Sequence, residues 1–284
     1  LMTNSGTSAL LLSMMVHEWD EDTEIIGPNF GNIAWVNACR FINHKPVFVD
    51  INKFTLCLDT DKIEESITSK TKAVVFVNHG GYSGLDLIKV RDICDEHNLI
   101  MIEDSCNALG YAGHIGDFSM FSFASPKIVS AGEGGCINFK DDKYKNKIKR
   151  LIYQGGWYDN EKREIKQKGL NFNLSPILCH WIDIQLNNID DTLTKREQMK
   201  DNYKSCSIHS NTNVDITLIT EKARKIHERL NKFKIQSLYR NYQPIKKGVC
   251  PNSHWACENT IQLPFSYQMN DTQIELISKI VGRI

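Results

Sequence analysis

A lysine and an aspartate follow two successive apolar runs of the chain. Asp104 ends the run Leu99–Glu103, and Lys127 comes shortly after the run Asp117–Phe123. An unprotonated lysine amine can bond to a carbonyl carbon, and a carboxylate favours the protonated form of a nearby pyridine nitrogen. The pair therefore suits pyridoxal phosphate (PLP), with Lys127 forming the imine and Asp104 keeping the ring nitrogen protonated. Taken singly, a helix-capping aspartate and a solvated lysine are the plainer explanations.

A candidate phosphate site lies at the start of the chain. Gly6 permits a tight turn, and Thr7 and Ser8 supply hydroxyl and backbone N–H groups where a helix is predicted to begin. Free N–H groups and the helix dipole attract a phosphate. An ordinary Ser/Thr N-cap accounts for the same residues. Ser122 is a further candidate for phosphate binding, or a plain strand residue.

Apolar runs and helical patterns alternate through the first half of the chain. The runs predict strands at Glu24–Gly27, Pro46–Ile51, Lys72–Val77, Leu99–Glu103, Asp117–Phe123 and Gly135–Phe139. Helical patterns lie between them at Ser8–Val16, Lys62–Ile67 and Leu85–Glu96. This alternation predicts an α/β fold with a largely parallel sheet, whose ligands lie beyond the carboxyl ends of the strands.

The second half of the chain has a different pattern. It predicts helices at Tyr144–Tyr153, Pro176–Ile189, Glu221–Lys232 and Asp271–Val281, a loop at Asp159–Lys168, and a connecting helix around Thr194–Tyr203. We therefore expect a large cofactor-binding domain over residues 1–190. A connecting helix and a small C-terminal domain would occupy residues 191–284.

Composition restricts the partners. The formal net charge is zero, which argues against a nucleic-acid partner, and no apolar stretch is long enough to cross a bilayer. The nine cysteines are scattered without a C-x-x-C pair, so neither a disulfide framework nor a metal site is indicated. A cytoplasmic protein is the expectation, also because the first residues lack the pattern of a signal peptide.

Several motifs occur together in a characteristic order. They are Asn4-Ser5-Gly6-Thr7-Ser8-Ala9-Leu10, Pro46-Val47-Phe48-Val49-Asp50-Ile51, Ile102-Glu103-Asp104-Ser105-Cys106-Asn107-Ala108-Leu109-Gly110, Gly116-Asp117, Pro126-Lys127 and Gly132-Glu133-Gly134-Gly135. In this set the chain resembles the DegT/DnrJ/StrS family of PLP-dependent sugar aminotransferases, from about Asn4 to about Asp190. The resemblance implies PLP-transferase fold type I, with a mostly parallel seven-stranded sheet sandwiched by helices and a small C-terminal α/β domain.

The resemblance also implies roles for individual residues. Lys127 matches the imine-forming lysine and Asp104 the partner of the pyridine nitrogen, and both are the expected catalytic residues. The other expected cofactor-binding positions are Gly6, Thr7, Ser8, Asn32, Asn107, Ser122 and Asn171. Asn107 stands where the family usually has glutamine near the ring hydroxyl. Asn171 matches an asparagine that reaches the phosphate from a neighbouring subunit, which implies a homodimer with shared active sites.

The implied reaction is an amino transfer in two halves. Glutamate would give its amino group to PLP, leaving pyridoxamine phosphate, which would then aminate a nucleotide-linked keto-deoxysugar. A 4-keto-6-deoxy sugar is the expected acceptor, with GDP-perosamine as one candidate product, in the biosynthesis of surface polysaccharides.

Two alternatives remain at this stage. Asn32 stands where the family usually stacks an aromatic ring on the cofactor, with Phe30 and Trp35 close by, and the family usually has a segment before the phosphate motif. These departures favour a catalytically weak or inactive relative that serves as a binding or regulatory module. The other alternative is a PLP-dependent sugar dehydratase. Dehydrating relatives commonly replace the lysine with histidine, so Lys127 weighs against it.

Overall fold

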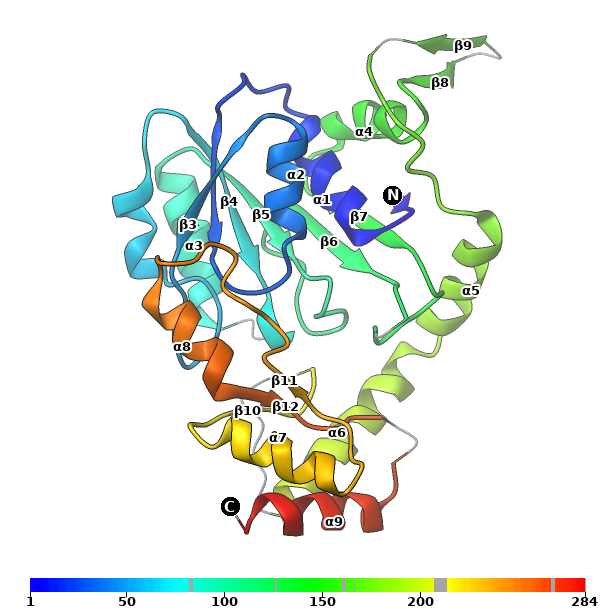
Figure 1. Cartoon of the computed structure of the whole chain (residues 1–284). Coiled ribbons are helices and arrows are strands. Elements are labelled where there is room, and N and C mark those ends of the chain that lie inside the picture. The colour runs from blue at the N-terminus through cyan, green and yellow to red at the C-terminus, as the bar shows by residue number, and fades with distance from the viewer. Residues whose placement is uncertain are drawn as a thin grey trace.

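A seven-stranded sheet forms the centre of the larger part of the molecule (Figure 1). The computed structural model describes residues 1–81, 84–125, 127–159, 162–165, 167–206, 214–266 and 269–283. The strands lie in the order β1-β7-β6-β5-β4-β2-β3. Their bounds are β1 Met2–Thr3, β2 Glu24–Pro28, β3 Lys45–Val49, β4 Thr71–Val77, β5 Ile100–Asp104, β6 Phe118–Ser122 and β7 Gly135–Phe139.

The strand directions place the chemistry at one edge of this sheet. Strands β2 to β6 pair in parallel, whereas β7 runs antiparallel to both β6 and β1. Because parallel strands end at the same edge, the residues that follow β4, β5 and β6 meet there. Asp104 is the last residue of β5 and Ser122 the last of β6.

Helices cover both faces of the sheet, and β4 shows how its sequence serves both. Ala73, Val75 and Val77 pack in one core cluster with α1 (Gly6–Met15) and α2 (Ala34–Phe41). Val74 and Phe76 pack on the opposite face, in a cluster that includes residues of α3 (Leu85–Glu96). A strand buried on both faces has to be apolar throughout, which explains the uninterrupted run of β4.

The C-terminal part forms a smaller layer below the large sheet in Figure 1. Its three-stranded sheet has the order β10-β12-β11, and its core is a cluster of α6, α7 and α9 side chains around Ile261. The remaining elements are α4 Lys145–Ile152, β8 Gly156–Asp159, β9 Lys162–Ile165, α5 Pro176–Leu186, α6 Ile189–Ser205, β10 Thr217–Ile219, α7 Ala223–Lys232, β11 Leu238–Tyr239, α8 Pro251–Asn259, β12 Thr260–Gln262 and α9 Asp271–Val281. The expected boundary near residue 190 stays a prediction; α6 begins at Ile189.

The sequence prediction of elements has three kinds of error. The predicted helix at Lys62–Ile67 is instead a pair of 3-10 helices, Thr60–Lys62 and Glu64–Ser66. The predicted loop at Asp159–Lys168 includes β9, which pairs with β8 as an antiparallel hairpin. The helices α2 and α8 and the strands β1, β8, β10, β11 and β12 were not predicted at all. Residues 160, 161 and 166 of that predicted loop lie outside the described residues.

An aromatic cluster beside α1 encloses a histidine. His17 stacks on Trp19 with ring centroids 4.3 Å apart, and Tyr144 meets it edge-on at 5.2 Å. Its Nε2 is buried and has no hydrogen-bond partner among the described residues. Burial, followed by the nearby charge of Lys147, lowers the pKa of His17 to about 4. The folded protein therefore holds this imidazole in its neutral form.

His17 should make the fold acid-sensitive. Unfolded, a histidine takes up a proton near pH ~6.5; folded, His17 does so only at about pH 4. Its contribution to stability is present above pH ~6.5 and is lost as the pH falls toward 4, because the unfolded chain binds the extra proton. We expect His17→Phe to reduce the fall in melting temperature between pH 7 and pH 4.5, measured by thermal denaturation. His114→Phe, at an exposed position, is the control; equal acid loss in wild type and His17→Phe would contradict the prediction.

Candidate functional site

A cavity of about 1200 Å³ lies between the strand ends of the large sheet and the small C-terminal part. The large part contributes Asn32, His79, Cys106, Asn107, Ser122 and Lys127 to its lining. The C-terminal part contributes Arg196, Asp215, Tyr242, Gln262 and Phe265. The two halves of the chain thus enclose one site, at the edge where sheets of this class bind their ligands.

Lys127 and Asp104 lie close enough to interact through charge. The Lys127 amine donates to Oδ1 of Asn107 at the cavity wall. Asp104 is buried, and its Oδ1 accepts the Cys106 N–H at 3.1 Å. Burial raises the pKa of Asp104, and the Lys127 charge opposes that shift. A cation beside Asp104, such as a protonated ring nitrogen, would therefore stabilise its charged form. Pro126, next to Lys127, lies outside the described residues.

The loop that carries Asn107 is anchored by Glu103. This carboxylate is fully buried. It accepts backbone N–H groups of Gly113 at 2.8 Å, Ile115 at 3.0 Å and Gly116 at 2.9 Å. The side-chain amide of Asn78 donates to it at 2.8 Å. A buried carboxylate is tolerated when hydrogen bonds satisfy it. The hydrogen bonds to Glu103 therefore fix the conformation of the loop after β5.

The start of α1 faces the same region. Ser5 is its N-cap, and its Oγ accepts the Ser8 N–H at 3.1 Å. The Ser8 hydroxyl donates to Oδ1 of Asn4 at 2.6 Å, while Thr7 is exposed. Gly6 is buried so closely that a Cβ there would lie 2.7 Å from Sγ of Cys106 and 3.1 Å from Cβ of Ser122. The helix start therefore packs directly on the strand ends that carry Ser122 and Asp104.

Asn32 lies on the cavity wall, and its Oδ1 accepts the Ala34 N–H at 2.9 Å, at the start of α2. The two aromatic residues near it are placed differently. Trp35 is fully buried in the core against Phe48. Phe30 is buried against His79 and Tyr242, with ring centroids 5.2 and 5.6 Å away. Asn32 and Ile33 are thus the exposed side chains of this segment that line the cavity.

Asn171 does not line the cavity of its own chain. It is exposed, and its carbonyl accepts the Asn4 side-chain amide at 3.3 Å. Asn171 therefore lies at the surface beside the entry to α1. Its predicted role at the phosphate of a neighbouring subunit stays a prediction.

The sequence did not single out the cavity residues of the C-terminal part. Tyr242 packs edge-on against His79, with ring centroids 5.0 Å apart. Burial lowers the pKa of His79 to about 4 and raises the pKa of Tyr242 to about 12. Both side chains are consequently neutral near pH 7. His79 itself belongs to the turn that follows β4, at a carboxyl end of the large sheet.

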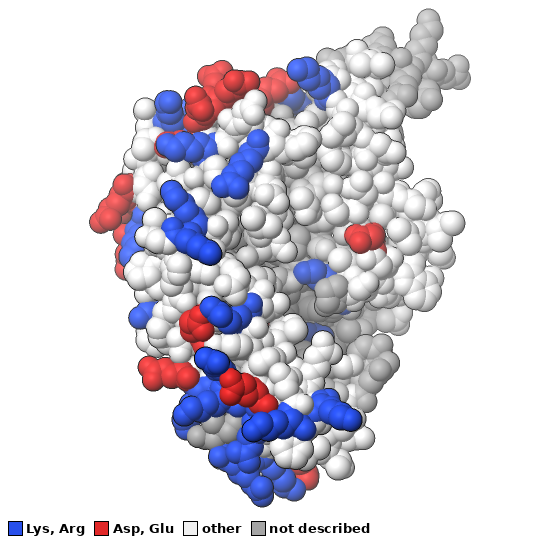
Figure 2. All heavy atoms as spheres, viewed as in Figure 1, with Lys and Arg blue, Asp and Glu red and all other residues white. Residues whose placement is uncertain are grey.

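A second hollow, of about 550 Å³, lies at the surface of the C-terminal part. It shares no lining residue with the first and is lined by Lys225, Glu228, Arg229, Lys232, Phe233 and Arg283. Figure 2 shows basic side chains gathered toward this end of the molecule. These are surface side chains, and nothing else in the hollow indicates a ligand.

Comparison with known proteins identifies the family. A family model described as the DegT/DnrJ/EryC1/StrS aminotransferase family matches residues 1–227. The chain belongs to this family. The solved structure of Helicobacter pylori PseC, an aminotransferase involved in the biosynthesis of pseudoaminic acid, is similar to it with a TM-score of 0.90 and 25% identity, over 100% of this chain and 85% of that chain.

Two curated proteins are similar in sequence. A dTDP-4-dehydro-2,3,6-trideoxy-D-glucose 4-aminotransferase of Saccharopolyspora spinosa is 24% identical, over 97% of this chain and 81% of that protein. A GDP-perosamine synthase of Caulobacter vibrioides is 33% identical, over 69% of this chain and 54% of that protein. The match to the latter thus covers about half of its length.

These findings confirm the family, the fold class and the enzyme class that the motifs predicted, with PLP as the cofactor of this family. The residues present fit such a cofactor. Lys127 faces the cavity, Asp104 is a buried carboxylate beside it, and the tight packing around Gly6 brings the start of α1 against the same strand ends. None of the chain's helices, in the part that the structure describes, is both long and apolar enough to span a membrane.

The packing around Gly6 predicts a double-mutant result. In Gly6→Ala the new Cβ would clash with the Cys106 sulfur, and overpacking of this kind costs about 1–3 kcal/mol. The start of α1 must move, so we expect lower thermal stability and weaker PLP binding. Cys106→Ala in the same chain removes the sulfur and should restore part of both. PLP titration and thermal melts of the two single variants and the double variant measure this coupling, and strictly additive effects would contradict it.

Proposed function

We propose that this protein is a PLP-dependent aminotransferase that moves an amino group from glutamate to a nucleotide-linked keto-deoxysugar. The observation that carries the proposal is that Lys127 and Asn107 meet at one wall of the large cavity, with the buried carboxylate of Asp104 close enough to feel the Lys127 charge. The names of the two curated relatives support a 4-keto-6-deoxy sugar as the acceptor.

Different residues of the chain would contact different parts of the cofactor. When bound, PLP supplies an electron sink for the carbon that gains or loses a proton. Lys127 would hold the cofactor and, when free, carry a proton between carbon positions. Asp104 would hold the ring nitrogen through charge, Asn107 would lie near the ring hydroxyl, and Asn32 would lie against the ring. Gly6, Thr7, Ser8 and Ser122 would hold the phosphate at the start of α1.

The proposed assembly is a homodimer with shared active sites. Three apolar side chains of α5, Ile177, Trp181 and Ile184, recur at helical spacing and are 80%, 54% and 43% exposed. A contiguous apolar stripe of this kind commonly marks a protein interface. Asn171 lies exposed a few residues before α5, which supports its proposed reach into the neighbouring subunit.

The nine cysteines are all free thiols, which supports the cytoplasm as the compartment.

The catalytic assignment predicts the behaviour of Lys127 variants. Borohydride reduction of the PLP-loaded protein should fix the cofactor to Lys127, as identified by peptide mapping. Lys127→Ala and Lys127→Arg should both abolish amino transfer from glutamate, because neither side chain can bond to the cofactor carbon and then release it. Lys89→Ala, at an exposed position of α3, is the matched control and should keep activity. Modification of another lysine, or activity in Lys127→Ala, would overturn the assignment.

A substrate screen tests the acceptor. GDP-, UDP- and dTDP-linked 4-keto-6-deoxy sugars are each incubated with the protein, PLP and glutamate, and aminated product is detected by mass spectrometry. If glutamate converts the cofactor but no acceptor is aminated, the assignment as an aminotransferase would stand. The assignment of a 4-keto-6-deoxy sugar as the acceptor would be rejected.

The dimer proposal predicts the effect of a charge on α5. We expect Trp181→Glu to convert a dimer to monomers in sedimentation experiments, because an isolated carboxylate is costly to bury in an apolar interface. Activity should fall with it, since each site would lose the partner's contribution. Phe233→Glu introduces the same charge at an exposed phenylalanine just after α7 and should leave the mass unchanged. A wild-type monomer would reject the proposed assembly.

A further inference from the structure

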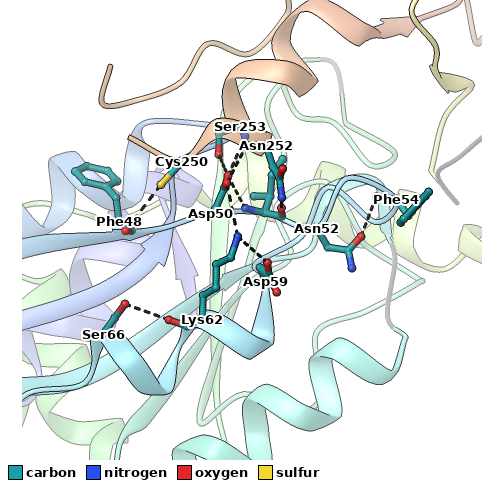
Figure 3. A network of polar contacts seen from close by, with 11 residues as sticks. Phe48, Asp50, Asn52, Phe54, Asp59, Lys62, Ser66, Cys250, Asn252 and Ser253 are labelled. Atoms are coloured by element: carbon teal, nitrogen blue, oxygen red, sulfur yellow. Dashed lines mark hydrogen bonds and ion pairs between the residues drawn. The ribbon is translucent and has the colours of Figure 1, made fainter. Parts of the chain in front are cut away.

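One carboxylate of the large part holds a helix of the C-terminal part. Asp50 directly follows β3 and is only 4% exposed. Its Oδ2 accepts the Asn252 N–H at 2.9 Å, and its Oδ1 accepts the Ser253 N–H at 2.9 Å and the Ser253 hydroxyl at 2.8 Å. Figure 3 shows these bonds converging on Asp50, with the Lys62 amine 3.9 Å away on the other side.

These contacts supply an N-cap that α8 lacks in its own sequence. The residue at its N-cap position is Cys250, which has a left-handed φ of 61° and makes no side-chain cap hydrogen bond. The first N–H groups of a helix have no partner within the helix, and a negative charge there is favourable. Asp50, about 200 residues earlier in the chain, takes over this function.

Asn29, at the end of β2, forms a second attachment beside the first. Its Oδ1 accepts the Lys246 N–H at 2.7 Å, and its Nδ2 donates to the Lys246 carbonyl at 2.9 Å. Its own carbonyl accepts the Ile245 N–H at 3.1 Å. Asn29 is fully buried. Together Asn29 and Asp50 fix the segment from Ile245 to Ser253 across the carboxyl ends of β2 and β3.

The attached segment connects two walls of the cavity. Residues 241–245 line the cavity before it, and Thr260, Gln262, Leu263, Pro264 and Phe265 line it after α8. Lys127, Asn107 and Ser122 belong to the opposite wall, which neither Asn29 nor Asp50 touches through a hydrogen bond in the described residues. The hydrogen bonds of Asn29 and Asp50 therefore fix the C-terminal wall of the site and not the wall that carries Lys127.

We propose that Asp50 and Asn29 are positioning residues that hold the C-terminal wall of the cavity, and that this wall binds the acceptor sugar nucleotide. The binding of the acceptor at this wall rests on the proposed function. Cofactor loading and the half-reaction with glutamate depend chiefly on the wall that carries Lys127 and Asp104. Loosening α8 should consequently weaken acceptor binding more than it slows the glutamate half-reaction.

The test compares Asp50→Asn with wild type. Asparagine keeps the shape but turns an N–H donor toward the N–H groups of α8. We expect KM for the acceptor to rise on the order of tenfold, the cost of losing a charge-assisted hydrogen bond, with the glutamate half-reaction changed less than threefold. Hydrogen exchange at the amides of residues 241–243, 245, 246, 252 and 253 should accelerate by a similar factor, while exchange in β4 and β5 stays unchanged. Ser253→Ala is a milder variant, for use if Asp50→Asn does not fold.

Asp141→Asn is the matched control. Asp141 also accepts a backbone N–H at a helix start, from Lys143 at 2.9 Å, but it is exposed and distant in sequence from the attached segment. It should leave KM and exchange at 241–253 unchanged. Unchanged exchange in Asp50→Asn, or equal losses in both half-reactions, would overturn the inference. Absence of amination in wild type, with the exchange change still present, would reject the proposed function and keep the positioning role.

Discussion

The buried carboxylate of Glu103 is the interaction on which the active-site wall depends. It sits at the penultimate position of β5 and is satisfied by three backbone N–H groups of the following loop together with Asn78. Leaving such a group unpaired would cost several kcal/mol, on the order of the ~3–5 kcal/mol measured for broken buried pairs. The loop therefore has one favourable conformation, and Asp104 and Asn107 take their positions from it.

The neighbouring residue shows how the same strand end serves two purposes. Side chains alternate along a strand, so Glu103 and Asp104 point to opposite faces of the sheet. Hydrogen bonds from the protein satisfy the Glu103 carboxylate. Asp104 is also buried, its carboxylate bonds to the Cys106 N–H and to the Cys106 side chain, and burial raises its pKa. The difference leaves Asp104 available to a cationic ligand group, whereas Glu103 is committed to structure.

Local patterns in the sequence were sufficient for six of the seven strands of the large sheet, all except β1. Uninterrupted apolar runs identified β4 and β5, and the Gly6-Thr7-Ser8 helix start and the Asp104–Lys127 pair followed from residue type and order. Elements defined by distant partners were missed. Helix α8 begins at a left-handed Cys250 and is capped by Asp50 from the other half of the chain. No window of sequence around α8 contains that information, and the cavity residues Tyr242 and Gln262 were missed for the same reason.

The neutral residues of the cavity narrow the choice of proton carrier. His79 is the histidine among the described lining residues, and its pKa of about 4 keeps it neutral and a poor acceptor near pH 7. Tyr242, with a pKa of about 12, stays protonated and releases its proton reluctantly. Efficient general acid–base catalysis needs a group that can exist in both states at the working pH. Arg196 is always charged, so none of these three side chains is suited to exchange a proton near pH 7, whereas the Lys127 amine already donates a hydrogen bond to Asn107 at the opposite wall.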